Sequence, residues 1–76
     1  MFFVCEQAAF DYLACFDRLD AAIQWGGKNC DVDYQDGTYS VYFEVHKWES
    51  GGTEYKMTEH RVPSTERAYN LQHGID

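Results

Sequence analysis

Carboxylates recur along one stretch of the chain, and they are the residues with the clearest capacity for chemistry. Asp31, Asp33 and Asp36 fall within DVDYQDG, and Glu44 follows on the next alternating run. A calcium loop built from such residues needs glycine at its sixth position and a bidentate glutamate at its twelfth. Counted from Asp31, those positions hold Asp36 and Tyr42. The spacing therefore favours solvent-facing carboxylates on a strand over a calcium site.

Thiols and imidazoles are the other reactive groups, and their spacing matches no common site. His46, His60 and His73 are 14 and 13 residues apart, without the short pair spacing of common zinc sites. A catalytic cysteine needs a base within hydrogen-bond reach, whereas the cysteines fall at positions expected to face the core. Three cysteines cannot pair completely within one chain, so we expect free thiols in a reducing cytoplasm. We predict no enzyme activity, metal or cofactor.

The element that positions these carboxylates is TYSVYFEVHKWE, residues 38–49. Its strict alternation and its aromatic and β-branched content predict a central strand. Successive side chains of a strand point to opposite faces, so one face should pack in the core and the other should face outward. The core face is expected to hold Tyr39, Val41, Phe43 and Val45, and the outer face Ser40, Tyr42, Glu44, His46 and Trp48.

A hairpin should join this strand to residues 29–35. Asp36-Gly37 is a favoured pair for a two-residue type I′ turn, and that turn lets both strands bury their apolar side chains on the same face. The aspartates then lie on the outer face, and no lysine or arginine occurs between Asn29 and His46. The expected cross-strand pairs are Tyr34 with Tyr39, Val32 with Val41 and Cys30 with Phe43.

A third strand is predicted over residues 53–62, ended by Pro63, which has no amide hydrogen. A two-residue Gly51-Gly52 loop would place Trp48 opposite Tyr55, whereas a longer loop would turn Tyr55 toward the core, and the sequence leaves both registers open. Ser64 is the expected N-cap of a short helix over residues 65–71. The two-residue loop also pairs His46 with Met57 and Glu44 with Glu59, and the helix should dock through Ala68, Tyr69 and Leu71.

Residues 5–24 are predicted to form a helix that ends at Gly26-Gly27, because apolar residues recur there at helical spacing. Phe10 falls on the opposite side as an exposed aromatic residue. Packing this helix on one face of the sheet hides both apolar surfaces. The expected fold is α+β, an N-terminal helix on a three-stranded antiparallel sheet with a short C-terminal helix, in one domain over residues 1–76. The helical stripe is Cys5, Ala8, Ala9, Tyr12, Phe16, Leu19 and Ile23.

The charge of the chain limits its partners. Six lysines and arginines stand against 13 acidic residues, a net charge of −7, in a chain that is 45% hydrophobic and can form a compact core. Such a body repels nucleic acid and anionic membranes and attracts basic surfaces. The opening MFFVC is cut short by Glu6, far below the length of a signal peptide or membrane span. We expect a cytoplasmic protein that binds neither nucleic acid nor membrane directly.

The outer face of the hairpin suggests a function. Alternate strand residues stand about 6.8 Å apart, so Asp31 and Asp33 offer charges at a spacing compatible with phosphates every ~3.4 Å along a nucleic-acid strand. We predict a non-catalytic inhibitor or interaction protein that occupies a basic, nucleic-acid-binding surface. The expected charges are Asp31, Asp33, Asp36 and Glu44, and the expected anchors are Tyr42, His46, Trp48 and Phe10.

A small acidic α+β domain with the aspartate-rich hairpin DVDYQDG resembles the small phage-encoded inhibitors, including anti-CRISPR proteins. Several of those inhibitors resemble DNA in charge and occupy nucleic-acid sites on a host complex. The resemblance is one of overall character, and no functional residue is carried over from it. It implies a stoichiometric protein in the host-cell cytoplasm whose target is a basic surface, such as that of a CRISPR effector complex.

Two other classes of function stay open from the sequence. A protein-interaction module or homodimer would use Phe10, Trp48, Tyr55 and the sheet edge, and its affinity would barely respond to salt. A small enzyme or metal protein would reveal itself by metal bound after purification. Salt dependence of binding separates the charge-based interaction from the aromatic one.

Overall fold

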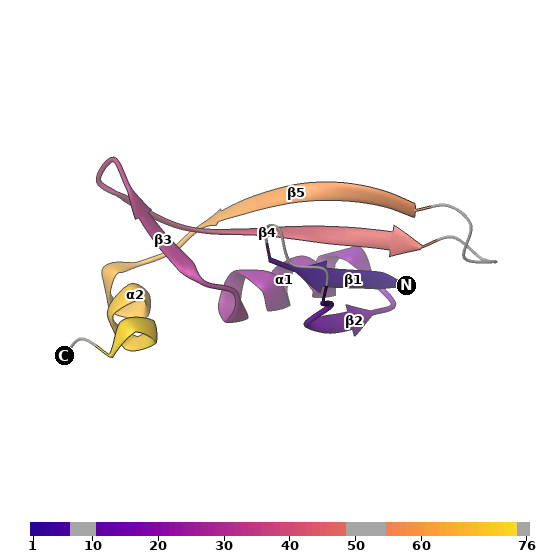
Figure 1. The fold of residues 1–76 in the computed structure, drawn as a ribbon, viewed down its shortest axis with the longest axis horizontal. Coiled ribbons are helices and arrows are strands. Elements are labelled where there is room, and N and C mark those ends of the chain that lie inside the picture. Colours follow the sequence, from indigo (N-terminus) through magenta and orange to yellow (C-terminus); the bar gives the residue numbers. More distant parts are fainter. Residues whose placement is uncertain (7–10, 49–54, 75–76) are drawn as a thin grey trace.

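The computed structural model describes residues 1–6, 11–48 and 55–74, which form an antiparallel sheet with two helices (Figure 1). The body is elongated, measuring 47 × 20 × 20 Å. The α+β class is confirmed, but the predicted order of elements is wrong at the N-terminus, where two strands precede the first helix. Within these ranges the elements are β1 (Phe2–Cys5), β2 (Ala14–Phe16), α1 (Leu19–Asn29), β3 (Val32–Gln35), β4 (Thr38–Trp48), β5 (Tyr55–Pro63) and α2 (Glu66–His73).

The centre of the sheet is β4, as predicted, and β1, β3 and β5 all pair with it. β5 pairs with one edge of β4 from Ser40 to Trp48. β3 and β1 share the other edge, β3 beside the first part of β4 and β1 beside the last part, and β2 adds to the outer side of β1. The predicted sheet of three strands is therefore incomplete. Val41, Phe43 and Val45 are buried on one face of β4, as expected.

The β3–β4 hairpin is confirmed in its predicted register. Asp36 and Gly37 both have positive φ angles, 52° and 78°, which a type I′ turn requires. The turn lies at one end of the long axis of the molecule (Figure 1). The two pairs that the turn fixes are Tyr34 with Tyr39 and Val32 with Val41.

The β4–β5 pairing decides between the two registers that the sequence leaves open. Trp48 lies opposite Tyr55, as a two-residue loop predicts, although residues 49–54 of the connection fall outside the described ranges. β5 ends at Pro63, as predicted. The same register pairs His46 with Met57, Glu44 with Glu59 and Lys47 with Lys56.

The N-terminal helix predicted over residues 5–24 is confirmed only from Leu19 on, and its first part is wrong. Residues 2–5 form β1, and its Val4 and Cys5 are completely buried. An extended segment can satisfy the backbone groups on the open edge of β4 while it buries these side chains, which a helix at this position could not do. Phe10, Ala8 and Ala9 belong to the residues outside the described ranges.

Helix α1 begins at Leu19 and covers the core face of the sheet. It continues through Gly26-Gly27, where the sequence predicts its end, to Asn29. A Cβ atom on Gly26 would lie 2.5 Å from Cε2 of Phe43, so glycine here serves close approach of helix and ring. Leu19, expected in the core, is 40% exposed at the start of the helix. The predicted Cys30–Phe43 pair is absent because β3 begins only at Val32.

Helix α2 is capped by Thr65, one residue beyond the predicted Ser64. The Ala68 N–H donates to Thr65 Oγ1 at 3.1 Å. Ala68 and Tyr69 pack against the core, as expected. Leu71 does not, since it is 72% exposed. Neither helix in the described part of the chain is long and apolar enough to cross a membrane.

Candidate functional site

Three of the four carboxylates predicted for the acidic surface are exposed at the hairpin end of the sheet. Asp31, Asp33 and Asp36 are all exposed there, Asp36 in the turn itself. Glu6, which follows β1, approaches from the neighbouring strand. Its pKa is raised by partial burial and, next, by the charge of Asp31, with a further contribution from Asp33. In the parts of the chain that the structure describes, which include all lysines and arginines, no ion pair reaches these aspartates.

Glu44, the fourth predicted charge, and the neighbouring Tyr42 lie in a different environment. β5 brings Arg61 opposite Tyr42, with the guanidinium carbon 5.3 Å from the centre of the ring. Arg61 Nη1 also donates to Ser40 Oγ at 2.8 Å. Arg61 of β5 thus places a positive charge on the outer face of the hairpin. The hairpin's own sequence contains no lysine or arginine there. Glu44 lies on the outer face but is largely covered, with only 17% of its side chain exposed.

The Tyr42 hydroxyl interacts with two acidic side chains of the sheet, Glu44 and Glu59. It donates to Glu44 Oε2 at 3.4 Å. Its pKa is raised to about 12, first by burial and then by a hydrogen bond with Glu59, with Glu44 adding to the effect. The phenol therefore stays protonated at neutral pH and acts as a donor between carboxylates.

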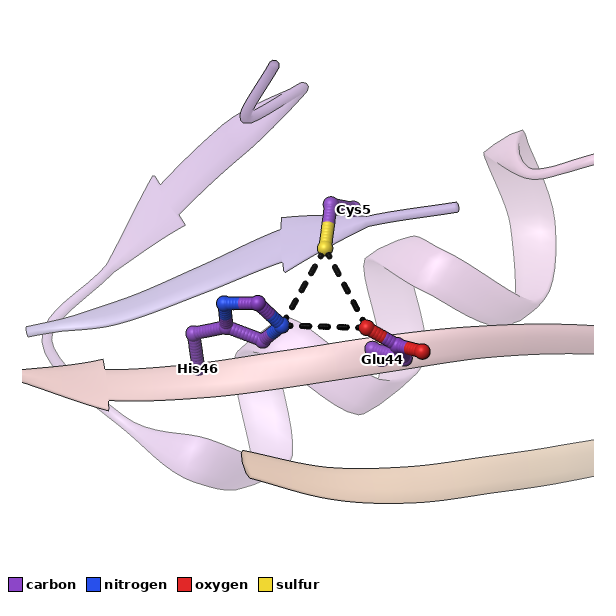
Figure 2. A group of neighbouring side chains, drawn as sticks. All are labelled: Cys5, Glu44 and His46. Atoms are coloured by element: carbon purple, nitrogen blue, oxygen red, sulfur yellow. Dashed lines mark hydrogen bonds and ion pairs between the residues drawn. The ribbon is translucent and has the colours of Figure 1, made fainter. Parts of the chain in front are cut away.

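Glu44 and His46 meet Cys5 on the outer face of the sheet (Figure 2). Alternate residues of β4 point to the same side, and β1 pairs Cys5 directly with Glu44. Cys5 Sγ lies 3.4 Å from His46 Nε2 and 3.8 Å from Glu44 Oε1. His46 Nε2 lies 3.1 Å from the same Glu44 oxygen. We call these three side chains the Cys-Glu-His cluster.

The second nitrogen of His46 is held from the other side. Tyr12 Oη lies 3.0 Å from His46 Nδ1, and Trp48 Nε1–H donates to Tyr12 Oη at 2.9 Å. The Phe3 ring stacks on Tyr12 with 4.7 Å between centroids. The predicted anchors His46 and Trp48 thus belong to one hydrogen-bonded chain that fixes the imidazole.

The Cys-Glu-His cluster lacks the geometry of a catalytic triad. In a triad the nucleophile and the acid bind opposite nitrogens of the histidine, whereas here the thiol and the carboxylate both approach Nε2. Burial raises the pKa of the Cys5 thiol, and the charge of Glu44 raises it further. The thiol is therefore a weak nucleophile. Three donor atoms of different kinds that converge on one point are instead the arrangement of a metal-binding group.

The opposite face of the sheet has a shallow apolar pocket of about 240 Å³. Lys47 and Lys56 lie directly across from each other at its rim, where their like charges repel. Lys47 Nζ lies 5.7 Å from the centre of the Phe2 ring. The remaining lining residues are Leu19, Val45 and Thr58.

Sequence reasoning placed Glu44 and His46 on one face correctly but missed Cys5, Glu6 and Tyr12. All three missed residues fall within residues 5–24, the range that the sequence assigned to a helix. The alternation of Glu44 with His46 in a strand was the one local signal for the cluster. No protein-family model, curated protein or solved structure matches this chain.

Proposed function

We propose that this protein is a small, acidic, non-catalytic interaction protein that binds the basic surface of a nucleic-acid-binding protein in the cytoplasm. The observation that carries the proposal is the group of exposed aspartates at the hairpin end, Asp31, Asp33 and Asp36, which have no ion-pair partner among the described residues. Glu6 adds a fourth carboxylate beside them. Crowding of like charges disfavours the folded state, and a basic partner would relieve it.

The magnitude of the charge points to local mimicry. A duplex as long as this molecule, 47 Å, would carry about 28 phosphate charges, whereas the net charge of the chain is −7. The protein therefore matches a few consecutive phosphates of one strand better than a whole duplex. Nucleases and CRISPR effector complexes, the targets that the resemblance to phage-encoded inhibitors implies, have basic grooves of this kind.

The structure changes which predicted residues we assign to this surface. Asp31, Asp33 and Asp36 remain as charges. Glu44 and His46 are removed, because they are held within the Cys-Glu-His cluster. Exposed charges act mainly on the rate of association and its salt dependence, so binding should weaken steeply as salt rises.

The test is a double charge reversal, Asp31→Lys with Asp33→Lys. A matched control is Asp11→Lys with Asp17→Lys, which changes the net charge equally at two exposed aspartates that flank β2. Each immobilised protein is offered the nucleic-acid-binding proteins that a heparin column retains from a bacterial lysate. Proteins captured at low salt are then challenged with single-stranded DNA.

We expect wild-type protein and the control to capture the same partner and to lose it to single-stranded DNA. The hairpin reversal should bind that partner roughly tenfold more weakly or worse, since each exposed charge contributes about 1 kcal/mol at contact distance in water. Capture that survives the reversal, or that single-stranded DNA does not displace, would show that the aspartates are not the binding surface.

A further inference from the structure

We propose that Cys5, Glu44 and His46 form a binding site for a zinc ion, with the fourth coordination position open to water. The ligand atoms would be the Cys5 sulfur, one Glu44 carboxylate oxygen and His46 Nε2. The site does not include the hairpin aspartates. The zinc proposal can therefore be refuted while the proposed function stands, and the proposed function can be refuted while the zinc proposal stands.

The separations of the three atoms fit a tetrahedral ion. With Zn–S near 2.3 Å and Zn–N or Zn–O near 2.0–2.1 Å, a tetrahedron places nitrogen and oxygen ~3.4 Å apart and sulfur ~3.5 Å from each. The observed separations are 3.1 Å for nitrogen to oxygen, 3.4 Å for sulfur to nitrogen and 3.8 Å for sulfur to oxygen. All three agree within about 0.3 Å, so an ion could enter with little movement of either strand.

The surroundings of His46 are those of a metal-binding histidine. Such a ligand usually uses its second ring nitrogen in a hydrogen bond that fixes the tautomer and the ring plane. Here Tyr12 Oη lies 3.0 Å from His46 Nδ1. Trp48 Nε1–H already donates to that oxygen, and a phenol oxygen has a second lone pair for a proton on Nδ1. Tyr12 can therefore hold the His46 ring through Nδ1, with Nε2 directed toward Cys5 and Glu44.

Protons satisfy the Cys-Glu-His cluster when no ion is bound. The Cys5 thiol donates to Glu44 Oε1, and a proton on His46 Nε2 would donate to the same oxygen. An entering zinc ion would displace the thiol proton to solvent, and the imidazole proton would move from Nε2 to Nδ1. One proton leaves for each ion bound, and no oxidation or reduction is involved.

The donor set selects the class of ion. Thiolate and imidazole favour zinc and related transition metals, whereas calcium and magnesium require oxygen ligands. Cys5 is buried, but Glu44 and His46 each expose about a sixth of their side chains, 17% and 16%, which gives an ion access from solvent. Since Cys5 belongs to β1 and the other two to β4, the ion would join the N-terminal strand to the centre of the sheet.

The test uses the full chain, stripped with chelator and kept reduced by a phosphine, and titrated with Zn²⁺ or Co²⁺. We expect one ion per chain. Tetrahedral Co²⁺ should show visible d–d bands and a sulfur-to-cobalt charge-transfer band in the near ultraviolet, both removed by Zn²⁺. At a hundredfold excess of Zn²⁺ over Kd, binding adds about 2.7 kcal/mol to stability, which raises Tm by roughly 10 °C or more for a chain of this size.

Matched variants locate the ligands. Cys5→Ser, Glu44→Gln and His46→Gln should each weaken binding by at least roughly tenfold, and Tyr12→Phe, which removes the group that positions His46, should do so by about tenfold. Their controls keep full binding: Cys15→Ser on the adjacent strand, Glu66→Gln on α2, and His60→Gln on β5.

Wild-type protein alone can overturn the proposal, so it does not depend on how well the variants fold. A Co²⁺ complex without the charge-transfer band would mean that no thiolate binds the ion. A Tm that Zn²⁺ leaves unchanged, or a Zn²⁺ affinity that survives Cys5→Ser in a folded variant, would also refute the site. An equal response to Ca²⁺ or Mg²⁺ would contradict the assigned ligands.

Discussion

Replacing Gly26 by alanine sets helix propensity against packing, and the structure indicates which effect is larger. Alanine in place of glycine stabilises a helix by about 1 kcal/mol. The new Cβ, however, would lie 2.5, 2.6 and 2.7 Å from Cε2, Cδ2 and Cζ of Phe43, where carbon atoms prefer ~3.5–4.0 Å. The helix and the ring would have to separate by about 1 Å.

The surroundings of Phe43 make that separation costly. The ring is completely buried among the core side chains, and overpacking of such a site costs about 1–3 kcal/mol. Because three ring atoms are involved, we take the upper end of that range. After the gain in helix propensity, Gly26→Ala should lower the free energy of unfolding by about 2 kcal/mol and Tm by roughly 10 °C.

Gly27→Ala is the matched control, since it brings the same gain in propensity one residue further along the helix. Its Cβ would meet a single atom below 3 Å, Val62 Cγ2 at 2.9 Å, with the next at 3.8 Å. A half-buried valine methyl can yield, so this variant should stay within about 1 kcal/mol of wild type. Urea unfolding followed by circular dichroism measures both.

Equal stability of the two alanine variants would refute the packing argument. A second check is the double variant of Gly26→Ala with Phe43→Leu. If the clash is with the ring, the leucine substitution should cost less in the alanine background than in wild type, a coupling that additive effects would not produce.

Three further outcomes follow from burial. Phe43→Ala should cost about 3–5 kcal/mol, whereas Leu19→Ala, at a 40% exposed site, should cost less than ~1 kcal/mol in urea unfolding; equal losses would show that the core is assigned wrongly. Exposed Cys15 should be alkylated quickly in the native protein and buried Cys30 only as the chain opens, and similar rates by mass spectrometry would contradict this difference. Burial, followed by the charge of Glu6, raises the pKa of Cys30 from 9.0 to about 11, so its contribution to stability is complete below pH 9 and is lost as the pH rises toward 11. Unfolding free energies measured across this range should fall less in Cys30→Ala, and an unchanged slope would rule the thiol out as a cause.

The elements that local chemistry specifies were predictable from the sequence. The Asp36-Gly37 turn fixed the β3–β4 register, and the strict alternation of residues 38–48 defined the strand that organises the sheet. Pro63 marked the end of β5. In each case neighbouring residues contain the whole signal.

The N-terminal region was mispredicted because its structure depends on a distant partner. The helical spacing from Cys5 to Ile23 is real in the sequence, yet β1 forms because β4 offers an open edge some forty residues later, with Val4 paired to Val45. Propensity yields to such tertiary pairing. Gly26 was misinterpreted for a related reason, since a close contact with Phe43 and a helix end both call for glycine.

The same dependence explains why the sequence indicated only two of the three residues of the Cys-Glu-His cluster. Glu44 and His46 are two residues apart on a strand, and their shared face follows from periodicity alone. Cys5 reaches them only through the pairing of β1 with β4, 39 and 41 residues away in the chain. No spacing motif covers such a distance, so the ligand set appears only when the strands are assembled.

The order of the strands also affects how the chain behaves during synthesis. Residues 2–5 leave the ribosome well before their partners in β4, which are residues 44–47. Translation proceeds at about 5–20 residues per second, so roughly 2–8 s pass between synthesis of the apolar segment FFVC and synthesis of the β4 residues with which it pairs. During that interval it is an unpaired strand available to other chains. Yield in the cell should therefore respond to chaperone supply and translation speed more strongly than the stability of the finished fold would suggest, which expression with and without added chaperones would measure.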